Sequence, residues 1–278
     1  MTEFLTEEFD LNRKETLSLL DELSLWSAPF GIQLLDAIKY RAGLNALDIG
    51  CGLGFPLIEL AMRLGSTSRV FGIDPWKSAL ERVNLKLEML GLRNASTIDG
   101  VAEDIPFADE HFDLIVSNNG INNVQDLGKT LAECRRVTKR GAQFVFTFNT
   151  DGSFEKFYQI FREVLAEFNL GRFNRNIDEH IYLKRKPLSE FKSRLSANGF
   201  RIVRVIEDSF DYRFANGTAA LRHFFIRIAF LHPWEEILPQ IYRTPVFAAI
   251  EKRMNESALS ADGISMNVPF VTIDCERI

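Results

Sequence analysis

Residues 46–55, which read ALDIGCGLGF, constrain the fold of this chain more than any other stretch. The apolar residues of 46–49 have the pattern of a buried parallel strand. Glycines at 50, 52 and 54 allow positive φ angles and leave a backbone without Cβ atoms, against which a ligand can lie. From Pro56 onward, apolar residues recur at helical spacing. A strand, a glycine turn and a helix in this order predict the first βα unit of a doubly wound α/β sheet, which binds a nucleotide at its turn.

The glycine spacing bears on which ligand the turn binds. A dinucleotide fingerprint is spaced G-x-G-x-x-G, whereas the glycines here are spaced G-x-G-x-G and no lysine supplies a phosphate contact. Asp48 lies in the strand just before the turn, and a carboxylate beside the ligand suits a cationic partner better than a pyrophosphate. The alternative is a tight strand-to-helix turn that binds nothing, which three glycines and an acid disfavour.

A second acid follows the next predicted strand. Residues 70–73 read as a buried strand, and Asp74 ends it. A carboxylate there can accept hydrogen bonds from both hydroxyls of a ribose, each worth roughly 1.5–3 kcal/mol when charge-assisted. Asp74 also suits the N-cap of the helix expected from Trp76 onward. The two roles are compatible.

The remaining periodic segments predict strands and helices in alternation. Further strands are expected at 95–99, 112–116, 142–148, 201–207 and 268–274, with a turn at Arg140-Gly141 before the third of these. A hydrophobic content of 46% with 24 Phe is ample for the core of one sizeable domain with insertions.

The sequence DIGCGLG resembles the first motif of class I S-adenosylmethionine (SAM)-dependent methyltransferases, and residues 42–150 match that family in the order and spacing of every element. The resemblance implies an α/β fold: a doubly wound, Rossmann-like sheet of seven mostly parallel strands, the last antiparallel beside the sixth. It implies SAM as cofactor, S-adenosylhomocysteine as product, and ribose binding by Asp74. The residues 42–278 are then the SAM-binding domain.

The loop 99–107, DGVAEDIPF, is similar to the adenine-contacting loop of that family but departs from it at one position. The family usually has an acid after the glycine, where this chain has Val101. Asp99, Glu103 and Asp104 each remain candidates to meet the adenine amino group, and the backbone of Ala102 can contribute. The predicted cofactor-binding residues are Asp48, Gly50, Cys51, Gly52, Gly54, Asp74, Pro75, Ala102, Glu103 and Asn118.

Residues 117–124, SNNGINNV, follow the fourth predicted strand, where sheets of this kind bind ligands. Their four Asn offer hydrogen-bond donors and acceptors without charge. Part of the cluster is explained by turn chemistry, since Asn tolerates left-handed geometry. We expect Asn118 near the cofactor and Asn122 or Asn123 near the substrate.

Segments outside the motif region are expected to form a lid and a cap. Residues 1–41 read as a helical segment, with a helix over 17–40 broken at Pro29-Phe30-Gly31; Trp26 and Phe30 belong either to the core or to a lid over the cofactor. Insertions at 151–186 and 209–264 are mainly helical, and in the resembling fold such insertions cap the substrate pocket.

One helix of the second insertion carries the candidate catalytic pair. Residues 219–231 have an amphipathic pattern, and His223 and Arg227 are four residues apart on it. Imidazole titrates near neutral pH, so His223 is the candidate general base and Arg227 the candidate partner of an anionic substrate group. The alternative is that both side chains meet solvent or an internal carboxylate such as Asp211.

Composition and missing motifs exclude several function classes. A net charge of −5 and a pI near 5.5 disfavour nucleic acid as a partner, and the motifs of base methylation are absent. The acidic start, the lack of an uncharged apolar run of 18 residues, and three scattered Cys predict a cytoplasmic protein with no membrane span and no metal site. We therefore expect a small-molecule methyltransferase, with a homodimer left open. The alternatives are a non-catalytic SAM-binding subunit and, less favoured, an NAD-dependent oxidoreductase.

Overall fold

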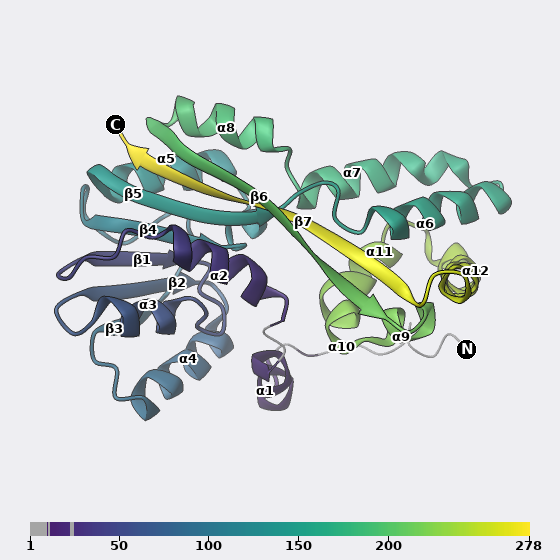
Figure 1. Ribbon diagram of the computed structural model, residues 1–278, viewed down its shortest axis with the longest axis horizontal. Helices are drawn as coiled ribbons and strands as arrows, with labels where there is room; N and C mark the ends of the chain where they lie inside the picture. Colours follow the sequence, from purple (N-terminus) through teal and green to yellow (C-terminus); the bar gives the residue numbers. More distant parts are fainter. Residues whose placement is uncertain (1–9, 11, 23–24) are drawn as a thin grey trace. The chain divides into compact units, whose positions relative to one another are not determined.

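The computed structural model describes residues 10, 12–22 and 25–278, and within them it contains one seven-stranded sheet. The strand order is β3-β2-β1-β4-β5-β7-β6, and β1 to β5 pair in parallel whereas β7 runs antiparallel to β5 (Figure 1). The predicted doubly wound, mostly parallel sheet is confirmed. The strands are β1 (Asn45–Ile49), β2 (Arg69–Asp74), β3 (Ala95–Asp99), β4 (Phe112–Asn118), β5 (Thr138–Asn149), β6 (Phe200–Phe214) and β7 (Ile264–Arg277).

The helices fall into two groups along the chain. Those that accompany the sheet are α1 (Lys14–Glu22), α2 (Ser27–Ala37), α3 (Leu57–Leu64), α4 (Lys77–Met89), η2 (Ile121–Asn123), α5 (Leu127–Val137) and α8 (Leu188–Ala197). The others are α6 (Glu155–Glu167), η3 (Gly171–Phe173), α7 (Asn174–Lys184), α9 (Gly217–Arg222), α10 (Phe224–Ile226), η4 (Arg227–Leu231), α11 (His232–Glu235) and α12 (Gln240–Leu259). None of the helices in the described ranges is long and apolar enough to cross a membrane.

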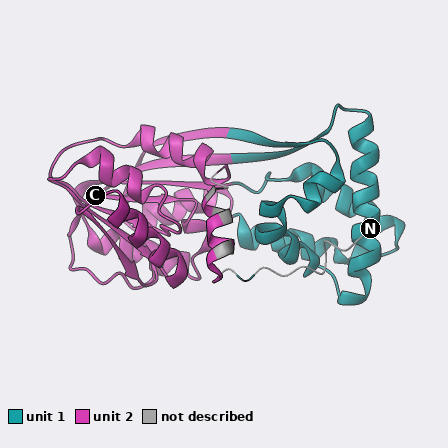
Figure 2. Cartoon of the chain, turned by 90° about the horizontal axis from the view of Figure 1, so that it is seen from below, with its two compact units in different colours: residues 1–10, 150–185, 209–269 teal, residues 11–149, 186–208, 270–278 magenta. Residues whose placement is uncertain are grey.

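The chain divides into two compact units, coloured separately in Figure 2. Unit 2 contains the sheet and consists of residues 11–149, 186–208 and 270–278. Unit 1 contains residues 150–185 and 209–269, and hence the second group of helices. The predicted insertion 209–264 lies within unit 1, and so does the insertion 151–186 apart from Lys186. Strands β6 and β7 contribute residues to each unit.

Helices cover both faces of the sheet in unit 2 because successive strand residues point to opposite sides. Phe144, Phe146 and Phe148 of β5 pack with α5 and α8, whereas Val145 packs on the other face with α2, α3 and α4. The rings of Phe148 and Phe191 stack with centroids 4.1 Å apart. Several of the 24 Phe therefore fill the layer beneath α5 and α8.

The predicted helix break at Pro29-Phe30-Gly31 is wrong, because α2 runs unbroken from Ser27 to Ala37. Pro29 lies in the first turn of α2, where its missing N–H is not required. Phe30 is fully buried, and its ring lies 4.8 Å from that of Phe270. Phe30 is therefore a core residue rather than part of a lid.

The predicted turn at Arg140-Gly141 is also wrong, since both residues lie inside β5. Gly141 has a φ of 72°, and the pairing of β4 with β5 changes register between Phe112 and Leu114. An irregularity in the strand thus takes the place of the expected turn.

Candidate active site

Four strand ends form the edge of the sheet at which the predicted site residues gather. Strands β1 to β4 are parallel, so Ile49, Asp74, Asp99 and Asn118 end at the same edge. Asp74 and Asp99 are register partners at the ends of β2 and β3. Ligands of doubly wound sheets bind outside such carboxyl ends.

The glycine turn after β1 has the backbone geometry that the sequence predicts. Gly50, Gly52 and Gly54 have φ angles of 72°, 48° and 100°. A Cβ atom on Gly50 would lie 2.9 Å from the Cα of Gly120, so the turn is in contact with the loop after β4. A Cβ atom on Gly52 would meet nothing within 4 Å, so the backbone faces open space at that point.

Asp48 lies beneath the turn with its carboxylate completely buried. Neither of its side-chain oxygens has a hydrogen-bond partner among the described residues. Burial raises the pKa of the Asp48 carboxyl well above its usual range, and the nearby Asp74 carboxylate raises it further. The nearby backbone N–H of Leu57, which does not meet the geometry of a hydrogen bond, offsets only part of this rise. A buried acid in this state lacks a cationic or hydrogen-bond-donating partner.

Asp74 joins the end of β2 to the glycine turn. Its Oδ2 accepts a hydrogen bond from the backbone N–H of Gly52 over 2.9 Å, and its Oδ1 accepts one from Trp76 N–H over 2.9 Å. Each carboxylate oxygen can accept more than one hydrogen bond, so these contacts leave capacity for a ligand hydroxyl. The neighbouring Pro75 is exposed at the same edge.

Cys51 turns its side chain away from this edge. The thiol is buried and lies against Gly72 of β2, where an added Cβ would be 2.7 Å from the sulfur. Burial and the carboxylates of Asp48 and Asp74 raise the pKa of the thiol. Only the backbone of Cys51 is therefore available to a ligand.

In the loop 99–107, most of the candidate acids have partners within the protein. Glu103 Oε1 accepts hydrogen bonds from the backbone N–H groups of Gln125 and Asp126, at 2.7 and 3.0 Å. Asp99 forms an ion pair with Lys77 at 3.0 Å. Asp104 is exposed, and Ala102 is buried in the core.

The asparagines after β4 form a network with the end of β5. Asn118 donates from Nδ2 to the carbonyl of Ser27 over 3.0 Å and accepts at Oδ1 from the hydroxyl of Thr147 over 3.0 Å. Asn122 Nδ2 donates to Asn119 Oδ1 at 2.9 Å and to Asn149 Oδ1 at 2.7 Å. Asn122 Oδ1 is buried without a hydrogen-bond partner in the part of the chain that the structure describes.

Asn123 is exposed, and its Nδ2 lies 3.5 Å from the carbonyl oxygen of Asn119. Asn122 and Asn149 therefore offer a more ordered binding surface than Asn123 does.

Residues 47–146 match the model of a family described as a methyltransferase domain. A demethylmenaquinone methyltransferase of Listeria welshimeri serovar 6b is 28% identical over 202 residues, which cover 69% of this chain and 82% of that protein. The chain contains a class I SAM-dependent methyltransferase domain at residues 47–146. It transfers the methyl group of SAM to a small-molecule acceptor.

Solved structures of methyltransferases share the fold. A SAM-dependent methyltransferase from Aquifex aeolicus superposes with a TM-score of 0.52 at 21% identity, covering 72% of this chain and 93% of that one. A geranyl diphosphate C-methyltransferase from Streptomyces coelicolor A3(2), solved with Mg²⁺, geranyl diphosphate and S-adenosylhomocysteine, has a TM-score of 0.56 at 16% identity. That comparison covers 99% of this chain and 87% of the other.

His223 and Arg227 of this methyltransferase do not lie on one continuous helix. His223 has φ −60° and ψ 129°, which ends α9 before α10 begins, and Arg227 starts the π-helical turn η4. The His223 ring packs against Phe214 and Tyr212, with centroids 5.3 and 6.1 Å apart. Burial lowers its pKa, so the imidazole is neutral at neutral pH. Asp211, the carboxylate suggested as their partner, instead accepts a hydrogen bond from Asn267 Nδ2 at 3.0 Å.

Two side chains to which the sequence analysis gave no role, Ser117 and Lys86, order this edge. The hydroxyl of Ser117 donates to the carbonyl of Ile49 and accepts from Ile121 N–H, at 2.9 and 3.0 Å. Lys86 Nζ donates to the carbonyl of Leu53 at 2.8 Å, and Lys86 also pairs with Asp21 of α1. In the sequence, Arg82 and Lys86 are four residues apart, which places both on one face of α4. This spacing is the signal that could have predicted a shared carboxylate partner.

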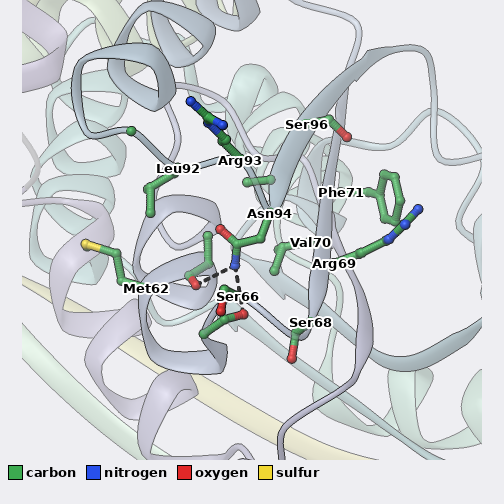
Figure 3. A pocket seen from close by; sticks show the side chains of 14 residues that line it. Met62, Ser66, Ser68, Arg69, Val70, Phe71, Leu92, Arg93, Asn94 and Ser96 are labelled. Carbon is green, nitrogen blue, oxygen red and sulfur yellow. Dashed lines mark hydrogen bonds between the residues drawn. The ribbon is translucent and has the colours of Figure 1, made fainter.

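A pocket of about 920 Å³ opens at the opposite edge of the sheet (Figure 3). Its lining includes Arg69 and Val70 at the start of β2, and Asn94, whose side-chain amide donates to the carbonyls of Ala61 and Gly65. Because these residues lie at or just before the starts of β2 and β3, the pocket lies away from the carboxyl ends of the strands and is separate from the predicted site.

Proposed function

We propose that this methyltransferase binds SAM at the carboxyl ends of β1 and β2 through Asp48, the glycine turn and Asp74. The observation that carries this proposal is the Asp48 carboxylate, which is fully buried and has no hydrogen-bond partner among the described residues. A ligand with a positive charge or with N–H donors would supply the partner that the protein lacks.

The predicted residues suit a cofactor with a sulfonium and an α-ammonium group. The carboxylates of Asp48 and Asp74 would offset the positive charges, and Asp74 would also accept hydrogen bonds from the ribose. Gly52 faces open space, so its backbone can lie against the cofactor. When bound, SAM supplies a methyl group on a sulfonium, which makes the sulfur a good leaving group.

The chain's own contribution to the reaction is positioning and exclusion of water. The acceptor atom must lie in line with the methyl group and the sulfur, and holding it there accounts for a large part of the rate. We propose that Asn122 and Asn149 orient the acceptor. His223, held neutral by burial, is the proposed general base for an acceptor that loses a proton.

We further propose that the acceptor is not a nucleic acid. The chain has a net charge of −5, and the loop after β4 reads SNNG in place of a base-methylation motif. The relative from Listeria acts on demethylmenaquinone by its name, which makes a quinone precursor one member of the acceptor panel to be tested.

The test begins with calorimetric titration of the purified chain with SAM, S-adenosylhomocysteine and NAD. We expect saturable binding of the first two and none of NAD. Transfer of label from methyl-labelled SAM to fractions of a metabolite pool then identifies the acceptor. Binding of NAD in place of SAM, or label transfer to DNA or RNA at rates similar to those for metabolites, would contradict the proposal.

A further inference from the structure

Unit 1 contains a guanidinium group that is buried without a carboxylate. Arg185, which follows α7, is only 2% exposed. Other arginines of this unit form ion pairs at the surface, for example Arg162 with Asp178 and Arg175 with Glu179. Among the described residues, Arg185 has no such partner. Removing a cation from water costs several kcal/mol unless an anion and hydrogen bonds compensate.

The contacts of Arg185 compensate only part of that cost. Its Nη1 donates a hydrogen bond to the hydroxyl of Tyr158 over 3.1 Å. Its Cζ lies 5.5 Å from the ring centroid of Phe154 and 5.9 Å from that of Tyr158. Such cation–π contacts stabilise a buried charge only in part. The Nε atom of Arg185 is buried and makes no hydrogen bond within the described part of the chain.

The hydroxyl of Tyr158 adds a second donor at the same place. Its oxygen accepts hydrogen bonds from Arg185 Nη1 and from Trp234 Nε1, the latter at 3.0 Å. With both lone pairs engaged, the hydroxyl proton must point to another acceptor. The described residues provide none. Arg185 Nε and the Tyr158 O–H are thus two neighbouring donors that both lack an acceptor.

The nearby titratable side chains do not neutralise the guanidinium. The His180 ring lies 6.2 Å from that of Tyr158, and burial together with Arg185 and Lys184 lowers its pKa to about 4, so it is neutral at pH 7. Glu235 is buried in the same unit, but the cations that act on its pKa are Arg243 and His232. Among the described residues, no carboxylate is therefore in place to neutralise Arg185, and an anion bound from solution would supply the missing charge.

We propose that Arg185 and Tyr158 form an oxyanion-binding site in unit 1, which binds the carboxylate or phosphate group of a small molecule. A guanidinium presents parallel N–H groups that match the oxygens of either anion, and the Tyr158 hydroxyl adds a third donor. The proposal does not depend on the proposed function. Anion binding by unit 1 is a separate property and can be measured without methyl transfer.

Trp234 provides the measurement, because its indole N–H donates to the Tyr158 hydroxyl. In a protein carrying Trp26→Phe and Trp76→Phe, Trp234 is the remaining tryptophan. We would titrate its fluorescence with inorganic phosphate, pyrophosphate and benzoate, at constant ionic strength. Saturation by the phosphates, by benzoate or by both shows which oxyanion the site accepts.

Variants then locate the bound anion. Arg185→Gln should raise the dissociation constant at least tenfold, and Tyr158→Phe should raise it severalfold. Arg175→Gln is the matched control, since it removes an exposed arginine from α7 with the same change in net charge. If Arg185→Gln does not fold, Arg185→Lys replaces it in the test. Lysine keeps the positive charge but lacks the planar guanidinium with its parallel N–H donors, so this variant should still weaken anion binding.

Two results would overturn the proposal. One is the absence of any saturable change in Trp234 fluorescence with these anions. The other is an equal dissociation constant in the Arg185 variants and in Arg175→Gln. Calorimetric titration with S-adenosylhomocysteine on the same variants separates this test from the proposed function, because unit 2 contains every predicted cofactor residue. Failure to bind the cofactor would leave the Trp234 measurement unaffected.

Discussion

The Asp74 carboxylate accepts a hydrogen bond from the backbone N–H of Gly52 over 2.9 Å. This contact links two positions that are 22 residues apart and that the sequence assigned separately to the cofactor. It means that the side chain proposed to bind ribose also orders the turn proposed to contact the rest of the cofactor. Changes at either residue are therefore expected to affect the other.

Asp74→Asn tests the charge at this position while preserving the size of the side chain. We expect the dissociation constant of SAM to rise about 10- to 100-fold, because charge-assisted hydrogen bonds exceed neutral ones by about 1–3 kcal/mol in total. Calorimetry measures this directly. Asp109→Asn, at an exposed acid before β4 paired with Arg136, should leave the affinity within about threefold. An unchanged affinity in Asp74→Asn would remove Asp74 from the site.

Gly52→Ala and Gly65→Ala form a matched pair. Both glycines have positive φ, at 48° and 74°, and a Cβ on either meets nothing within 4 Å. Each substitution should lower the free energy of unfolding by about 1 kcal/mol through backbone strain. Only Gly52→Ala should abolish detectable SAM binding, since its methyl group would occupy the cofactor's space. Equal SAM affinity in the two variants would show that the cofactor does not contact Gly52.

Asp48→Asn should have opposite effects on stability and on binding. The raised pKa of Asp48 means that ionisation destabilises the folded protein, so this cost is absent at low pH and grows as the pH rises above the ordinary carboxyl range. At pH 8 and without ligand, we expect Asp48→Asn to raise the melting temperature. The additional stabilisation by saturating SAM should become smaller than in the wild type. A lower melting temperature without ligand would contradict this account.

The sheet and the edge that contains the candidate site could be predicted because both depend on local patterns. Continuous apolar runs mark parallel strands that are buried on both faces, and residues after such strands reach a common edge. Asp48, the glycines and Asp74 could therefore be placed together from strand order alone.

Features that depend on contacts distant in the sequence could not be predicted in this way. Pro29 and Gly31 read as a helix break, yet Pro29 occupies a first turn, and Gly31 allows α2 to approach Phe55, whose Cε1 would lie 2.1 Å from an added Cβ. The amphipathic spacing of 219–231 gave no sign of the extended backbone at His223. The burial of Arg185 follows from its contacts with Phe154 and Tyr158, which no local pattern reveals.

His223→Gln tests the proposed general base. Burial lowers the pKa of His223, so the neutral ring persists below pH 6.5 and the plateau of kcat should extend below that pH. With an identified acceptor, we expect His223→Gln to lower kcat by about 10²-fold or more. His232→Gln, at an exposed histidine near Glu236, is the control. Turnover within about twofold of the wild type, with an unaltered pH profile, would show that His223 is structural.

His180→Gln should reduce the acid sensitivity of folding. The His180 pKa is about 4 in the folded protein, against about 6.5 when unfolded, so the unfolded chain takes up the proton first. The stabilisation of the folded protein that results from this pKa difference is complete above pH 6.5 and is lost as the pH falls toward 4. Between pH 7 and 5, the free energy of unfolding should fall by on the order of 1–2 kcal/mol more in the wild type than in His180→Gln, allowing for partial exposure of the ring. Urea unfolding of both proteins at the two pH values measures this difference. An equal fall in the free energy of unfolding in the two proteins would contradict the prediction.

The distribution of the two units along the chain limits how this protein can be shortened. Within residues 25–278, the polypeptide passes from one unit to the other at 149/150, 185/186, 208/209 and 269/270. Because β7 lies between β5 and β6, a fragment that stops after residue 149 would lack both outer strands and would expose the hydrogen-bonding edge of β5. Open edges of that kind recruit other strands and aggregate. Separating the units for study therefore requires internal excision and rejoining of the chain rather than a truncated gene.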